Sequence, residues 1–206
     1  MNILIFGGGG LAHALARSTL ISAFHDVTIL EHSDCDVRDY RAVVEQIEKE
    51  RPDYIVCTAG VSDRRFGSTL QEVVETNLIG AMHVGQAAAA FGTPCVLVAS
   101  TAGISPGEHK WYGPAKAGVI NFARAMGNLG HQVYAVSPGR MNTRMRKDDF
   151  PDENPRTQLN PKRVASVIID ILDGEYAPGA NVVVRKVGMT RVDVYEEAAP
   201  CLPSLL

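Results

Sequence analysis

Four consecutive glycines, Gly7 to Gly10, lie between a short apolar run, Asn2 to Phe6, and a segment of helical spacing that begins at Leu11. Glycine permits a sharp strand-to-helix turn because it has no side chain to obstruct it. Such a turn also directs backbone N–H groups at the helix start toward an anion such as a pyrophosphate. A tight turn without a ligand is the alternative. The residues expected to bind a dinucleotide here are Gly7, Gly9, Gly10, Leu11 and Ala12.

Short apolar runs and longer segments of helical period alternate along the rest of the chain. We expect strands over residues 2–6, 27–31, 54–58, 95–100, 132–137 and 181–186, and helices over 11–23, 40–50, 70–90, 112–128 and 161–172. Alternation of this kind predicts an α/β fold: a Rossmann-like, doubly wound parallel sheet with helices on both faces. The interval between Glu31 and Tyr40 is too short for the usual crossover helix and third strand, so that edge of the sheet should be reduced.

Composition sets the class of protein and of partner. With 206 residues, 46% of them hydrophobic, the chain should fold as a single domain, 1–206. Its net charge of −3 favours a small-molecule ligand over nucleic acid or an anionic membrane. The four cysteines are widely separated and include no C-x-x-C pair, so no metal site is expected. No apolar stretch is long enough to span a membrane, and we expect a cytoplasmic protein.

Two polar segments allow alternative interpretations. Residues 147–161 contain three prolines and form either a solvated surface loop or a lid over a substrate pocket. Basic residues follow two strand ends, at Arg64-Arg65 and from Arg140 to Lys147. They are either solvated loop residues or contacts for an anionic substrate such as a carboxylate or phosphate.

Acidic residues at the end of the second strand bear on the choice of cofactor. Glu31 stands where a carboxylate accepts hydrogen bonds from both ribose hydroxyls of NAD, and it would repel the additional phosphate of NADP. Because His32 and Ser33 follow, no basic residue immediately succeeds it. NAD is therefore favoured over NADP. Asp36 and Val37 should contact the adenine, although Asp36 is also a candidate helix cap.

Tyr112 and Lys116 are four residues apart at the start of a predicted helix, and so lie on one face about one turn apart. A free phenol is protonated at neutral pH, and a neighbouring ammonium group and the positive nicotinamide of a cofactor would lower its pKa. The pair could then move a proton on a substrate oxygen. Ser100 ends a strand where its hydroxyl could bind the same oxygen, and Asn77 could hold a water that leads to Lys116.

Six segments carry a family resemblance. They are Gly7 to Ala12, Thr58-Ala59-Gly60, Asn77, Ser100 with Ala102-Gly103, Tyr112-Gly113-Pro114-Ala115-Lys116, and Ser137-Pro138-Gly139 with Thr143. In this order they resemble the motifs of the short-chain dehydrogenases/reductases, and the reduced edge resembles compact members of that family. The glycine loop looks one residue shorter than the family's usual form, with Ala12 in place of a glycine, and Thr58 replaces a frequent asparagine.

The resemblance implies a role for each segment. Tyr112 would be the general acid/base, Lys116 would tune it and bind the nicotinamide ribose, Ser100 would polarise the substrate oxygen, and Asn77 would complete the tetrad. Thr58, Ala59 and Gly60 would lie beside the adenosine, and Pro138, Gly139 and Thr143 would hold the carboxamide. The implied activity is NAD(P)-dependent interconversion of an alcohol and a carbonyl, in a homodimer or homotetramer. A non-catalytic dinucleotide-binding regulator or scaffold, or a nucleotide-sugar epimerase, dehydratase or reductase, is the alternative.

Overall fold

A computed structural model of the chain describes residues 1–19, 26–105, 107 and 109–197. The seven strands form one sheet in the order β2-β1-β3-β4-β5-β6-β7. They are β1 (Asn2–Phe6), β2 (Asp26–Leu30), β3 (Tyr54–Cys57), β4 (Cys95–Val98), β5 (Val133–Pro138), β6 (Asn181–Val187) and β7 (Arg191–Glu196). Each neighbouring pair is parallel except β6 and β7. The predicted Rossmann-like sheet is confirmed, and β2 forms its edge because the short segment after Glu31 adds no further strand.

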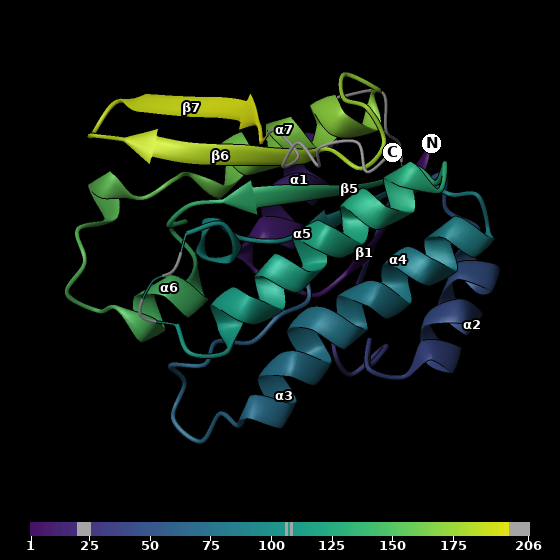
Figure 1. Cartoon of the computed structure of the whole chain (residues 1–206), viewed down its shortest axis with the longest axis horizontal. Helices are drawn as coiled ribbons and strands as arrows, with labels where there is room; N and C mark the ends of the chain where they lie inside the picture. The colour runs from purple at the N-terminus through teal and green to yellow at the C-terminus, as the bar shows by residue number, and fades with distance from the viewer. Residues whose placement is uncertain (20–25, 106, 108, 198–206) are drawn as a thin grey trace, which may run out of the picture.

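Helices cover both faces of the sheet. They are α1 (Gly10–Thr19), α2 (Tyr40–Glu50), α3 (Leu70–Val74), α4 (Ala81–Ala90), α5 (Tyr112–Asn128), α6 (Arg144–Asp149) and α7 (Pro161–Leu172). One core packs α1 and α7 against Ile3 and Ile5 of β1, and the other packs α2, α4 and α5 against Leu4 and Phe6. Because alternate strand residues point to opposite faces, a single strand supplies both cores. Figure 1 shows α4 and α5 side by side across one face.

Three elements differ from the sequence expectations. The helix predicted over 70–90 is interrupted by a π-helical turn, Glu75–Gly80. The short helix α6 forms where only a polar loop or lid was expected. The antiparallel strand β7 was not predicted, because a strand at the edge of a sheet needs only a weak apolar pattern. Figure 1 shows β7 along the outer side of the sheet, next to β6. Residues 20–23, the predicted end of the first helix, lie outside the described residues.

Candidate active site

The glycine turn connects β1 to α1 with almost no free space on its inner side. Gly7 has a φ of 110°, and a methyl group added to it would lie 2.7 Å from both Thr58 Oγ1 and the Ala59 amide nitrogen. A methyl group on Gly9 would instead meet no atom within 4 Å. The chain therefore turns tightly inward at Gly7 and leaves an open backbone surface at Gly9, just before α1 begins at Gly10. This cradle at a helix N-terminus fits a pyrophosphate.

The two predicted residues that follow contribute differently. The side chains of Leu11 and Ala12 are buried in the hydrophobic core beneath the turn. Only their backbone, in the first turn of α1, remains for contact with a cofactor. Gly10 lies near Thr143, since a methyl group added to Gly10 would be 3.5 Å from Thr143 Cγ2. The tertiary structure thus brings the first and fifth strand ends together.

Glu31 lies against this turn, as the sequence predicts for a ribose-binding carboxylate. A methyl group on Gly8 would be 2.9 Å from Glu31 Oε1. The adjoining cavity of about 390 Å³ is bordered by Gly7, Gly9, Asp36, Val37, Thr58 and Gly60. Asp36 does not cap the next helix; that position belongs to Asp39, whose carboxylate accepts hydrogen bonds from the amides of Arg41 and Ala42.

Two arginines that sequence reasoning did not connect with the cofactor also border this cavity. Arg38 binds Asp36 through Nη2 at 2.6 Å, and Arg65 forms an ion pair with Glu72. Hydrogen bonding from Arg38 is the main cause that lowers the pKa of the Asp36 carboxyl. Both cations are matched by a carboxylate, so the charge nearest the glycine turn is that of Glu31.

Asn77 fixes the segment that follows β3. It is fully buried within the π-helical turn. Its Oδ1 accepts a hydrogen bond from the Val61 amide at 3.0 Å, and its Nδ2 donates to the Val61 carbonyl at 2.8 Å. A methyl group on Gly60 would be 2.5 Å from Oδ1, so glycine is required there. The amide predicted to hold a water is thus engaged with the backbone through both of its polar atoms.

Lys116 is buried, and its ammonium group lies over the Tyr112 ring. It is 3% exposed, and its ammonium group donates a hydrogen bond to the Val98 carbonyl at 2.7 Å. The same nitrogen is 5.6 Å from the centre of the Tyr112 ring. Burial lowers the pKa of Lys116 to about 8. The group can therefore be charged at neutral pH and can release a proton slightly above it.

The protein's own groups raise the pKa of Tyr112, contrary to the sequence expectation. Burial raises it to about 12; hydrogen bonding with the Ser100 side chain lowers it, and the charges of Asp149 and Asp63 raise it. Burial outweighs the hydrogen bond with Ser100, and Lys116 is not among the groups that shift this pKa. The lowering expected from Lys116 together with a positively charged nicotinamide stays a prediction. Tyr112 is thus a protonated phenol at neutral pH, suited to donate a proton.

A carboxylate that sequence reasoning missed organises the start of α5. Asp63 accepts hydrogen bonds from the amides of Trp111 at 2.9 Å and Tyr112 at 3.1 Å, and from His109 Nδ1 at 2.7 Å. Burial raises the pKa of Asp63, but these three hydrogen bonds outweigh burial and lower it. The His109 ring in turn packs 5.1 Å from the Tyr112 ring, centre to centre. No spacing in the sequence indicates this contact, because Asp63 follows a different strand.

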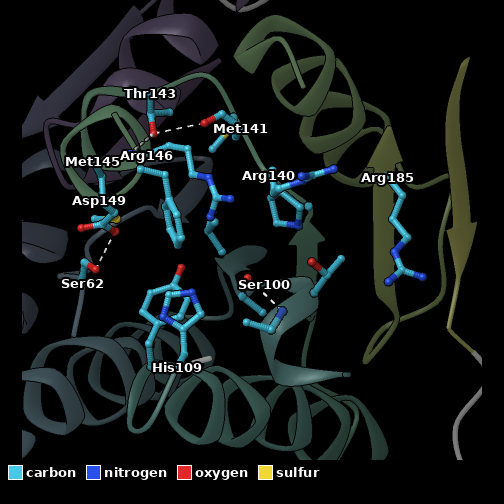
Figure 2. A pocket seen from close by; sticks show the side chains of 18 of the residues that line it. Ser62, Ser100, His109, Arg140, Met141, Thr143, Met145, Arg146, Asp149 and Arg185 are labelled. Carbon is cyan, nitrogen blue, oxygen red and sulfur yellow. Dashed lines mark hydrogen bonds between the residues drawn. The ribbon is translucent and has the colours of Figure 1, made fainter. Parts of the chain in front are cut away.

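A second cavity, of about 480 Å³, is bordered by several of the predicted site residues. Ser100, Tyr112, Pro138, Gly139 and Thr143 all border it, and Met145 borders both cavities. Figure 2 shows His109 on one side of this cavity, Arg146 on another and Arg185, from β6, on a third. Ser100 and Tyr112 therefore meet the predicted carboxamide-binding segment around one space that adjoins the glycine turn, whereas Asn77 and Lys116 are not among the residues that border it.

The predicted loop or lid forms one wall of this cavity. Asp149 and Phe150 border the cavity, and Asp149 accepts a hydrogen bond from Ser62 at 2.6 Å. The far end of the segment is anchored by Leu159, which is fully buried and pairs with Met141 in an isolated β-bridge. A wholly solvated loop is therefore ruled out for residues 147–161, while movement as a lid stays a prediction.

Glu153 should stabilise this wall in a pH-dependent way. Its carboxylate accepts hydrogen bonds from Arg140, Arg146 and Gln158, and hydrogen bonding from Arg146 is the main cause that lowers its pKa from 4.5 to about 2. Because the folded-state pKa is depressed, the stabilisation is present above pH 4.5 and is lost as the pH falls toward 2. We expect Glu153→Gln to lower the free energy of unfolding at pH 7 by about 1–3 kcal/mol.

Urea denaturation at pH 7 and pH 3 measures the free energy of unfolding of Glu153→Gln and of wild type. The difference between the two proteins should be smaller at pH 3 than at pH 7. Asp148→Asn is the matched control, since the Asp148 carboxylate is 68% exposed and pairs with the exposed Arg144. It should change stability by less than about 0.5 kcal/mol. Equal effects of the two substitutions would contradict the role given to Glu153.

Within the described part of the chain, no helix has both the length and the apolar character to cross a bilayer. In the same residues, no three histidine, cysteine, aspartate or glutamate side chains converge as a metal ion would require.

Comparison with known proteins gives a match over much of the chain. A family model described as short chain dehydrogenase matches residues 19–154, about two thirds of the sequence. The matched segment includes Glu31, Asn77, Ser100, Tyr112 and Thr143 but begins after the glycine turn. No curated protein sequence matches.

Many solved structures share the fold. A ribose-5-phosphate isomerase structure from Brucella melitensis is 21% identical with a TM-score of 0.74, over 90% of this chain and 91% of that one. An oxidoreductase of the short-chain dehydrogenase/reductase family from Burkholderia thailandensis is 21% identical with a TM-score of 0.72, over 88% and 90%. A small-chain dehydrogenase in complex with NADPH is 16% identical with a TM-score of 0.74, over 90% and 97%.

Proposed function

The chain belongs to the short-chain dehydrogenase family, and we propose that it is an NAD(P)-dependent oxidoreductase that reduces a carbonyl compound to an alcohol, with Tyr112 as the general acid. The observation that carries this proposal is the meeting of Tyr112 and Ser100 at one cavity that adjoins the glycine turn. A non-catalytic binding protein has no need for such an arrangement. The test is turnover of a panel of carbonyl compounds, followed by NADH and NADPH absorbance, in wild type and Tyr112→Phe.

A bound nicotinamide cofactor would supply the hydride. The glycine cradle and the N-terminus of α1 would hold its pyrophosphate, while Pro138, Gly139 and Thr143 would hold its carboxamide end. Lys116 would bind the nicotinamide ribose, as the family resemblance implies, and its ammonium group lies 5.6 Å from the centre of the Tyr112 ring.

The chain's own groups would complete the reaction at the substrate oxygen. Ser100 would donate a hydrogen bond to that oxygen and so favour the negative charge that develops on it. Tyr112 would then transfer its proton to the same oxygen. The raised pKa of Tyr112, about 12, keeps the phenol protonated at neutral pH and therefore favours the reductive direction. Lys116, with a pKa of about 8, would return a proton toward Tyr112 after each turnover.

We further propose that NADH binds more tightly than NADPH. Glu31 lies against Gly8, where the adenosine ribose would pass. Replacing it with glutamine retains the size of the side chain but removes the charge that accepts ribose hydrogen bonds. Glu31→Gln should weaken NADH binding about tenfold or more, and NADPH binding should be unchanged or stronger. Titration of cofactor fluorescence measures both dissociation constants.

Arg38→Gln is the control for this experiment. Arg38 borders the same cavity but is paired with Asp36, so its loss should change the affinity for either cofactor by less than about threefold. Tighter binding of NADPH than NADH by the wild type, together with a loss of that binding in Arg38→Gln, would overturn the proposed preference.

A further inference from the structure

Arg185 lies at the carboxyl end of β6, the last parallel strand of the sheet. Val184 is in register with Pro138 of β5, and its carbonyl accepts a hydrogen bond from the Gly139 amide at 2.8 Å. Arg185 follows directly and borders the cavity that contains Ser100 and Tyr112. Three consecutive parallel strands thus contribute to one space: β4 through Ser100, β5 through Gly139 and β6 through Arg185. Ligands of such sheets bind at these strand ends.

The charge of Arg185 is not matched by any described residue. Its cross-strand neighbour, Asp193 of β7, accepts a hydrogen bond from Arg191 at 2.5 Å instead. Within residues 1–19, 26–105, 107 and 109–197, no hydrogen bond or ion pair involves the Arg185 guanidinium. Lys186, the next residue, is by contrast engaged with the Arg156 and Gln158 carbonyls.

The other charges around this cavity are compensated. Arg140 and Arg146 share the Glu153 carboxylate, with distances of 2.9 and 2.5 Å. Asp149 accepts a hydrogen bond from Ser62. Among the charged side chains that border the cavity and are described, Arg185 is therefore the one positive charge without a protein acceptor. A substrate that enters would leave this guanidinium partly desolvated, which is costly unless the substrate brings an acceptor.

We propose that Arg185 binds an anionic group of the substrate, a carboxylate or a phosphate monoester, while Tyr112 and Ser100 bind its carbonyl oxygen. A planar guanidinium matches the two oxygens of either anion. Arg185 lies on a different side of the cavity from His109, whose ring packs against Tyr112 (Figure 2). The anion and the reacting carbonyl would therefore be at different ends of the same molecule. This inference rests on the proposed carbonyl reductase function.

The test uses pairs of aldehydes that differ in charge. 4-Carboxybenzaldehyde is compared with its neutral methyl ester, and glyceraldehyde 3-phosphate with glyceraldehyde. We expect wild type to favour the charged member of at least one pair by about tenfold or more in kcat/KM. Arg185→Gln should remove that preference mainly through KM, and turnover of the neutral member should stay within about twofold. The pair that responds identifies the anion.

Arg41→Gln is the matched control, because Arg41 lies on α2, is exposed and is paired with Glu45 outside the cavity. It should leave both preferences unchanged. Equal turnover of charged and neutral aldehydes by wild type, or equal losses in Arg185→Gln and Arg41→Gln, would overturn the inference. If instead the proposed function is wrong, wild type will reduce no aldehyde, neutral or charged.

A binding measurement keeps the inference testable without turnover. Trp111, the one tryptophan of the chain, directly precedes Tyr112, which borders this cavity, and its fluorescence serves as the probe. Titration with the two anionic ligands 4-(hydroxymethyl)benzoate and glycerol 3-phosphate should give binding of at least one that is about tenfold weaker in Arg185→Gln than in wild type. Unchanged affinity for both, or no binding of either to the wild type, would reject Arg185 as an anion site.

Discussion

Replacing Tyr112 with phenylalanine should lower kcat for carbonyl reduction by about a hundredfold to ten-thousandfold, the range that a positioned general acid contributes. The substitution removes the phenolic oxygen and leaves the ring, so the packing of His109 against it should persist. Cofactor affinity should stay within about twofold, because the hydroxyl is not among the groups that hold the dinucleotide. Steady-state kinetics with NADH and fluorescence titration of the cofactor separate these two quantities.

The control for Tyr112→Phe is Tyr134→Phe, which removes the hydroxyl of a tyrosine buried in the core on the opposite face of the sheet. It should leave kcat nearly unchanged. Undiminished activity of Tyr112→Phe on a carbonyl substrate would refute the proposed mechanism. If wild type binds NADH but reduces no carbonyl compound, and Tyr112→Phe behaves identically, the non-catalytic binding protein becomes the better interpretation.

Replacing Lys116 with methionine should have opposite effects on activity and stability. The ammonium group is buried and its pKa falls from 10.5 to about 8. Since the folded state binds this proton less tightly than the unfolded state, the charge destabilises the fold increasingly as the pH falls from about 10.5 to 8. Methionine fills a similar volume without a charge. We expect kcat to fall about a hundredfold while the free energy of unfolding at pH 7 rises by about 1–2 kcal/mol.

Denaturation at pH 7 and pH 10.5 tests the stability part of this prediction, because the advantage of Lys116→Met should shrink at the higher pH. The substitution also removes the hydrogen bond to the Val98 carbonyl, and this loss limits the rise in the free energy of unfolding. Lys162→Met, at an exposed position in the first turn of α7, is a control that should change neither activity nor stability by much. A Lys116→Met protein that is active, or one that is clearly less stable at neutral pH, would contradict the proposed roles.

Most of the fold follows from patterns that are local in the sequence. The apolar run before Gly7 and the periodic segment after it predict β1 and α1, and the bounds expected for α2, α5 and α7 agree with the structure. Long amphipathic helices and buried parallel strands are predictable because each residue's environment repeats with the local period. The π-helical turn around Asn77 was not predictable in this way, since it depends on hydrogen bonds with Val61 on another segment.

The sequence indicated candidate members of the site but not the electrostatic interactions among them. Order along the chain led to Tyr112, Lys116 and Ser100, because strand ends and helix starts are visible in the sequence. The pKa of Tyr112 was expected to fall, yet burial and the charges of Asp63 and Asp149 raise it. Those carboxylates are 49 and 37 residues away in the chain, so no spacing rule connects them with the phenol.

The sequence by itself therefore determined the α/β class, the glycine turn and the order of the motifs, because each depends on residues close together along the chain. Only the tertiary structure decided which charges face one another across the strand ends. It matched His109 with Asp63 and placed Glu153 between Arg140 and Arg146. It also brought Arg185 to the same cavity as Tyr112 without a described acceptor. Electrostatic interactions depend on distance and burial in space, and these are set only when the strands align.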